Sequence, residues 1–69
     1  MYKNLRAEMV RKDIDVPKLA EMIGMKISAL YARLNGTAKL SFAEAVTIKQ
    51  VLGVEMPLEE LFEERKEEQ

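Results

Sequence analysis

The residues with the clearest chemical potential in this 69-residue chain are three cations in a stretch that holds no acid. Lys26, Arg33 and Lys39 fall between Met22 and Ala43, where neither Asp nor Glu occurs. Such a stretch can attract an anionic partner although the net charge is −1, because the Debye length at physiological salt is only about 8 Å. The alternative is that these side chains are simply solvated. The chemistry predicted here is therefore anion binding, and the surrounding elements must decide whether it is used.

The composition argues against an enzyme. The chain has no Cys and no His, which removes the thiol nucleophile and the imidazole base that hydrolases use most often. The same two absences exclude disulfides and leave a zinc site without its usual ligands. Four carboxylates cluster near the end of the chain, but we interpret them as a solvated helix surface; they are Glu59, Glu60, Glu63 and Glu64. We expect no metal and no other cofactor.

The length predicts one domain, because domains usually run from about 50 to 250 residues. At 48% hydrophobic the chain has the material for a core. No apolar run reaches the roughly 18 residues of a membrane-spanning helix, and no charged-then-apolar leader opens the chain. We therefore expect a soluble, cytoplasmic domain that does not enter a membrane.

Charge is distributed unevenly along the chain. Residues 1–54 hold nine Lys and Arg against five acids, whereas residues 55–69 hold two against seven. We interpret the acidic tail, residues 63–69, as a solvated helix end.

The spacing of the apolar residues predicts helices throughout, because no run alternates with period two for long enough to form a strand. Asp15 is a good N-cap for the second helix, and Pro17 falls in the first turn, where its missing N–H costs nothing. Ser41 and Glu44 have the spacing of a capping box at the start of the fourth helix. The predicted helices cover roughly residues 2–12, 15–23, 26–35, 41–52 and 57–62.

Two glycines predict where helices stop. Gly24 closes the second helix and Gly53 the fourth, since glycine tolerates the left-handed backbone of a helix C-terminus. We expect the inner face of the fourth helix to consist of Phe42, Ala45, Ile48 and Leu52. The pattern predicts an all-α, five-helix bundle that forms a single domain over residues 1–69.

Residues 15–36 have the layout of a helix-turn-helix: a cap, a short helix ending at Gly24, a very short turn, and a second helix ending at Asn35-Gly36. This layout is typical of proteins that present the second helix to the major groove of DNA. Ala20 is small enough to let the two helices cross closely, and Leu30 would pin the second to the first. Paired amphipathic helices also occur in bundles that bind no DNA, so the pattern alone leaves both possibilities open.

Three segments carry a further likeness: Leu19-Ala20-Glu21-Met22-Ile23-Gly24-Met25, Ser28-Ala29-Leu30-Tyr31 and Leu34-Asn35-Gly36. In this order and spacing they resemble the Cro/repressor-type (lambda-repressor-like) helix-turn-helix family, above all its small phage-type regulators. The likeness continues through the fourth and fifth helices and covers roughly residues 5–62. It implies a compact five-helix DNA-binding domain.

The resemblance also implies roles for individual residues. The recognition helix would be residues 26–35, with Ile27, Ser28 and Tyr31 meeting base edges. Contacts to the DNA backbone would come from Pro17, Lys18, Lys26, Arg33, Asn35, Thr37 and Lys39. Ser28 can donate or accept a hydrogen bond, whereas Ile27 can only contact a thymine methyl or exclude water. For Ile27 and Tyr31 the alternative is packing against neighbouring helices.

The chain departs from the family pattern at several positions. Val16 stands where the family often has Gln, and Lys26 stands where many members have a Ser cap. Ala29 and Ala32 are too short for hydrogen-bonded readout. Specificity would then depend on few contacts or on DNA shape.

Our first hypothesis is a sequence-specific transcriptional regulator of double-stranded DNA, a small Cro-like repressor that acts by promoter occlusion. One such module buries only about 600–1,000 Å², so we expect a homodimer on a pseudo-palindromic operator with half-sites about 34 Å apart. Phe62 is the predicted dimer contact, with packing in its own core as the alternative. We expect no small-molecule effector.

The second hypothesis is a protein-interaction module of the antitoxin or antirepressor type. It would keep the helix-turn-helix scaffold without strong DNA binding. Val16, the alanines of the predicted recognition helix and the acidic tail motivate it.

Overall fold

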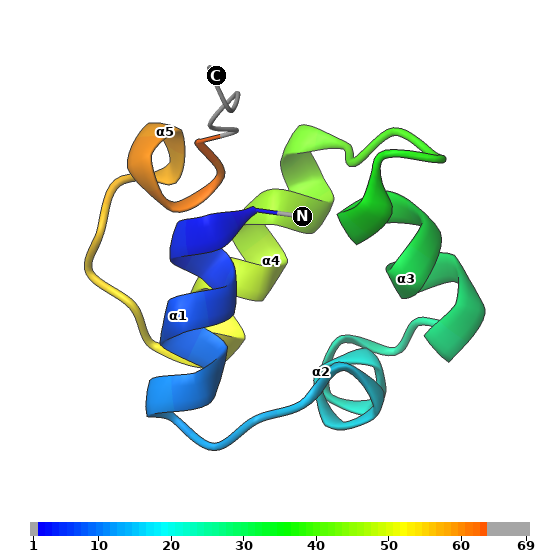
Figure 1. Cartoon of the computed structure of the whole chain (residues 1–69), viewed down its shortest axis with the longest axis horizontal. Coiled ribbons are helices and arrows are strands. Elements are labelled where there is room, and N and C mark those ends of the chain that lie inside the picture. Colours follow the sequence, from blue (N-terminus) through cyan, green and yellow to red (C-terminus); the bar gives the residue numbers. More distant parts are fainter. Residues whose placement is uncertain (1, 64–69) are drawn as a thin grey trace, which may run out of the picture.

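The computed structural model describes residues 2–63, which form five α-helices and no strand (Figure 1). The helices are α1 (Lys3–Arg11), α2 (Val16–Ile23), α3 (Ile27–Asn35), α4 (Phe42–Leu52) and α5 (Leu58–Leu61). The predicted all-α architecture is confirmed for this part of the chain, although α5 is only about one turn long. Residues 64–69 of the predicted acidic tail lie outside the described residues.

Side-chain caps begin α2 and α4, as the sequence predicts. The Asp15 carboxylate accepts the backbone N–H of Lys18 at 2.9 Å. The Ser41 hydroxyl accepts the backbone N–H of Glu44 at 3.1 Å, and the Glu44 carboxylate accepts that of Ser41 at 3.0 Å. These bonds satisfy N–H groups that have no partner inside a helix.

Leucines from four of the helices form the centre of the core. The largest fully buried side chains are Leu5, Leu19, Leu30, Leu34, Ile48 and Leu61. In the described part of the chain, α2 packs against α3 and α4, while α5 packs against α1 and α4. α4 therefore joins the two pairs, α2 with α3 and α1 with α5.

One predicted core residue is wrong. Phe42 was expected on the inner face of α4, but its side chain is 75% exposed, whereas Ala45, Ile48 and Leu52 are buried. Phe42 is the first residue of α4. Because Cα–Cβ bonds tilt toward the N-terminus of a helix, the side chain of the first residue has no preceding turn of its own helix to lie over, so apolar periodicity alone does not bury it.

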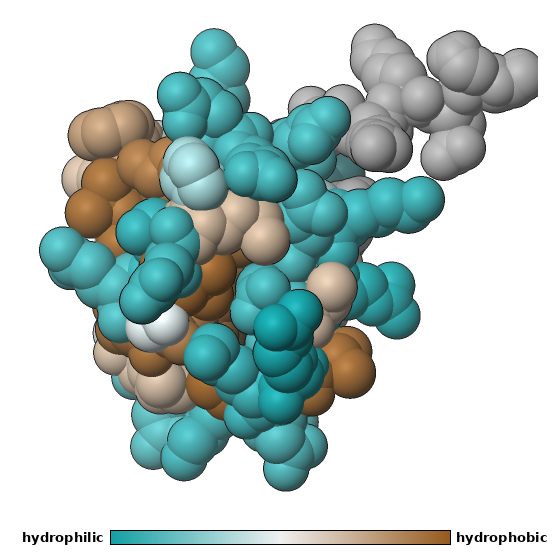
Figure 2. Space-filling view, turned by 90° about the vertical axis from the view of Figure 1, so that its left-hand side faces the viewer, coloured by the Kyte–Doolittle hydropathy of each residue, from teal (hydrophilic) through white to brown (hydrophobic). Residues whose placement is uncertain are grey.

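The helices pack tightly, with a Cα radius of gyration of 11.3 Å, close to the roughly 11 Å expected for a compact chain of this length. α3 forms one edge of the domain, and α5 lies at the opposite edge beside α1 (Figure 1). On the side of α5, hydrophilic residues cover most of the surface, and hydrophobic residues gather at the upper left and show between them at the centre and lower right (Figure 2). None of the described helices has the length and apolar character needed to cross a membrane.

Candidate nucleic-acid interface

The turn between α2 and α3 is short and fixed by backbone hydrogen bonds. Gly24 follows α2 with φ of 73°, in the left-handed region that glycine adopts most easily. The N–H of Met25 donates to the carbonyl of Ala20 at 2.9 Å, and α3 begins two residues later at Ile27. Ala20 is 1% exposed, so a small residue lies buried at this junction, as the sequence predicts.

α3 has one buried face and one open face. Leu30 and Leu34 are buried in the core. The three residues predicted to read bases are all exposed: Ile27 by 46%, Tyr31 by 42%, and Ser28 as well. Ile27 is therefore not part of the buried core, and α3 lies at the edge of the domain (Figure 1).

Three exposed lysines lie on α2 and on the segments that precede and follow α3. Lys18 lies in the first turn of α2, Lys26 is the N-cap residue of α3, and Lys39 lies in the connection to α4. Within residues 2–63 none of them forms an ion pair or a side-chain hydrogen bond. The other predicted backbone contacts Pro17, Asn35 and Thr37 are exposed too. α3 thus has an uncharged exposed face, and the exposed lysines of α2 and of the segments before and after α3 are available to bind an anion.

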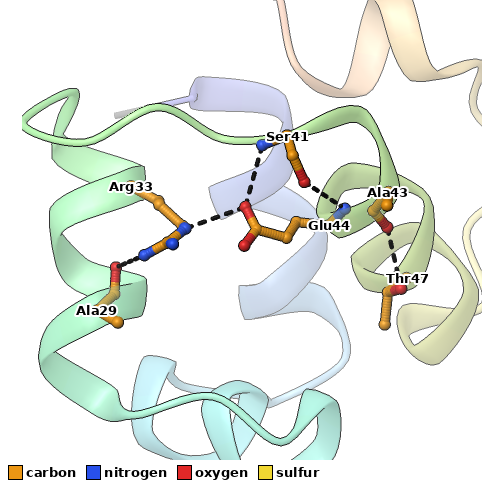
Figure 3. A network of polar contacts seen from close by, with 6 residues as sticks. All are labelled: Ala29, Arg33, Ser41, Ala43, Glu44 and Thr47. Atoms are coloured by element: carbon orange, nitrogen blue, oxygen red, sulfur yellow. Dashed lines mark hydrogen bonds and ion pairs between the residues drawn. The ribbon is translucent and has the colours of Figure 1, made fainter.

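Arg33 differs from these lysines because its charge is used inside the molecule (Figure 3). Its Nε lies 3.0 Å from Oε1 of Glu44 in an ion pair, and its Nη1 donates to the carbonyl of Ala29 at 3.1 Å. Only 26% of each charged side chain is exposed. The pair fastens α3 to the start of α4.

The pKa of the Glu44 carboxyl is lowered below its ordinary value. The largest cause is the hydrogen bond from the backbone N–H of Ser41, and the Arg33 guanidinium adds to it, while burial acts in the opposite direction. Glu44 therefore serves both as the partner of the cap and as the counter-ion of Arg33. The first role follows from the capping-box spacing, whereas the second links residues eleven apart and has no signal in the sequence.

The predicted dimer contact, Phe62, lies far from α3 and is half-buried. Its ring meets that of Tyr2 edge to face, with centroids 5.3 Å apart and planes at 81°. A second link between the same segments is the hydrogen bond from Nδ2 of Asn4 to the carbonyl of Glu60, at 2.7 Å. Phe62 thus has a packing role within the subunit, and a role in dimerisation would be additional.

An open groove of about 650 Å³ lies beside the exposed face of α3. Its lining comes from α1, the α1–α2 connection, the start of α2 and Tyr31 of α3, and it is mostly apolar but includes Arg6, Asp13 and Asp15. Val10 on its wall is 73% exposed, an apolar exposure that the sequence analysis did not single out. Val16, which replaces the Gln expected from the family pattern, also lines this groove.

No group of three or more acidic side chains within residues 2–63 is arranged to hold a metal ion. Comparison of the chain with protein-family models, with curated proteins and with solved structures found no match.

Proposed function

We propose that this protein is a sequence-specific regulator of double-stranded DNA that places α3 in the major groove. The observation that supports the proposal most is the two-sided character of α3. Leu30 and Leu34 anchor it in the core, while Ile27, Ser28 and Tyr31 are exposed together. An α-helix held in this way at the edge of a domain fits the width of the groove. In this reading α2 and α3 form a lambda-repressor-like helix-turn-helix.

Lys18, Lys26 and Lys39 would neutralise phosphates on either side of the groove. Each phosphate contact contributes about −0.9 to the slope of log K against log salt concentration. Three lysines per subunit therefore correspond to a slope of about −3, and a dimer to about twice that. Arg33 would act indirectly, because its ion pair with Glu44 holds α3 in place.

The protein would bind as a homodimer to a pseudo-palindromic operator and repress by occluding the promoter. A single module of this size buries too little surface for tight binding. α5 lies at the opposite edge of the domain from α3 (Figure 1), so a dimer formed through α5 and Phe62 would leave α3 open. Half-sites would then be separated by about 34 Å, one turn of the double helix.

A mobility-shift titration with random-sequence duplex at low salt tests the proposal. We expect binding in the micromolar range or tighter that weakens steeply as salt is raised. Lys39→Ala should weaken binding to every duplex alike and flatten the salt slope by about one unit. Lys49→Ala on α4, outside the proposed interface, is the matched control. It should leave the affinity for DNA and the salt slope unchanged. No retardation of any duplex would contradict the proposal.

The groove beside α3 favours a second candidate function, the binding of a protein partner. Val10 and Tyr31 leave an apolar wall open to solvent, and a partner segment with apolar side chains could cover it. In that case no duplex would be retarded at low salt, and Val10→Ser would abolish capture of the partner. DNA binding that survives Val10→Ser would favour the regulator.

A further inference from the structure

We infer that the exposed face of α3 recognises thymine methyl groups and does not read guanine or adenine edges by paired hydrogen bonds. The inference rests on the proposed function and adds the chemical class of the sequence that would be bound. In the major groove, Arg or Lys pairs with guanine, Asn or Gln with adenine, and apolar side chains contact the methyl group of thymine. The side chains of α3 can be sorted by these three kinds of recognition.

Guanine has no Arg available to it on α3. Arg33 is the only Arg in this helix, and Glu44 and the carbonyl of Ala29 hold its guanidinium at 3.0 and 3.1 Å. Lys26 is exposed but lies at the N-cap, before the first turn. We assign it to a phosphate, and the experiment below tests that assignment separately.

α3 is also poorly equipped to read adenine by paired hydrogen bonds. The one amide side chain in the helix belongs to Asn35, its last residue. Asn35 is eight residues beyond Ile27, which places it about 12 Å further along the axis at 1.5 Å per residue. A helix that enters the groove through its first turns keeps this amide near the sugar-phosphate backbone.

The first turns of α3 instead expose Ile27 and Tyr31, which lie one turn apart on the same side of the helix. Ile27 has no donor or acceptor, so its only favourable contact at a base edge is with an apolar group. Thymine alone presents such a group in the major groove, its 5-methyl. Ser28 beside it can donate to or accept from several bases and therefore discriminates less. The exposed lysines on α2 and on the segments before and after α3 favour an anionic partner such as DNA over an apolar peptide.

The test uses a duplex of about 20 bp, long enough for two half-sites one helical turn apart, taken from a selection on random sequences. Each thymine is replaced in turn by deoxyuridine, which keeps the base pair and removes only the methyl group. We expect one or two positions in each half-site at which affinity falls about three- to fivefold, the effect of withdrawing one buried methyl. At the same positions, cytosine should bind more weakly than thymine, and 5-methylcytosine should recover part of the loss.

Variants connect the effect to Ile27. With Ile27→Ala the thymine and deoxyuridine duplexes should bind equally at the position that Ile27 contacts, whereas Phe42→Ala, which removes an exposed apolar side chain on α4, should keep the difference. Lys26→Ala should weaken all duplexes to the same extent. Thermal unfolding of each variant checks that the variant is folded. The deoxyuridine series uses the unaltered protein, so its result does not depend on the folding of any variant.

Three outcomes would overturn the inference. Selective binding that ignores every deoxyuridine replacement would leave the regulator in place and remove the methyl readout. A loss of guanine preference in Lys26→Ala would assign recognition to the lysine instead. If no duplex is retarded, the proposed function fails and the inference fails with it.

Discussion

Asp13 has an unusual backbone conformation for a residue with a side chain. Its φ is 59°, the only positive φ of a non-glycine residue among those described. Asp13 lies just beyond the C-cap of α1. Its N–H donates to the carbonyl of Val10 at 3.0 Å, and the N–H of Ile14 donates to the carbonyl of Met9 at 2.8 Å. This Schellman arrangement commonly holds glycine at the position of Asp13.

Replacing Asp13 by Gly should therefore stabilise the protein. Glycine removes the steric cost of the left-handed backbone, and part of the gain is offset by greater freedom of the unfolded chain. We expect the free energy of unfolding to rise by about 0.5 kcal/mol, whereas Asp13→Ala should lower it by about 1 kcal/mol. Urea denaturation measures both. A less stable Asp13→Gly would mean that the carboxylate itself stabilises the turn.

Leu30 and Ile27 are one turn apart in α3 but differ in exposure, 0% against 46%. Leu30→Ala should lower the free energy of unfolding by about 2–5 kcal/mol, because it leaves a cavity in the core. Ile27→Ala should cost less than about 1 kcal/mol, since most surface substitutions have small effects. Equal losses in chemical denaturation would show that Ile27 is packed more deeply than its exposure indicates.

The free energy of unfolding should depend on pH through Glu44, which links α3 to α4. Its pKa is lowered in the folded state by the Ser41 N–H and the Arg33 guanidinium. A lowered folded-state pKa stabilises the fold above the unfolded-state pKa, which is about 4.3 for Glu, and the contribution is lost as pH falls through the folded-state value. The advantage of the unaltered protein over Glu44→Gln should therefore be constant near neutral pH and shrink below about pH 4.

Denaturation of both proteins across an acid pH series measures this difference. Gln can still complete the capping box, so the comparison isolates the charge. Arg33→Gln removes the counter-ion and should reduce the same pH dependence without touching the cap. A difference that grows as the pH falls would contradict the assignment.

Helix ends could be predicted from the sequence because their causes are local. The cap at Asp15 and the box formed by Ser41 and Glu44 involve residues three apart. The open face of α3 also follows from local periodicity, since burial of Leu30 and Leu34 leaves Ile27, Ser28 and Tyr31 exposed. These features of the candidate site needed no knowledge of how the helices are arranged.

Features that depend on contacts between helices could not be predicted in the same way. Phe42 fits the apolar periodicity of α4, but at the first position of the helix its side chain is 75% exposed. The absence of acids from its stretch of sequence predicts that Arg33 meets phosphate, yet the fold brings Glu44, at the start of α4, within 3.0 Å of it. Sequence spacing is silent on both points, since neither involves residues within one turn of each other.

Phe62 has a packing role where the two ends of the described chain meet, and a dimer contact is proposed for it. The effects of these two roles must be separated. Its ring packs on Tyr2, and Asn4 holds the same segment through the carbonyl of Glu60. Phe62→Ala should lower the free energy of unfolding by at least the roughly 0.5–1.5 kcal/mol of an aromatic pair. If Phe62 also contacts a second subunit, the variant should in addition dissociate at higher concentrations in sedimentation equilibrium.

Binding to DNA separates packing from dimerisation more sharply. Loss of the dimer should weaken binding to a duplex with two half-sites by tenfold or more, because the second half-site no longer adds to the affinity, while binding to a single half-site should stay the same. Asn4→Ala is the matched control, since it breaks another link between α1 and α5 and leaves the Phe62 ring intact. If both variants weaken two-site binding equally, Phe62 acts by positioning α5; if only Phe62→Ala does, its ring itself forms part of the contact between subunits.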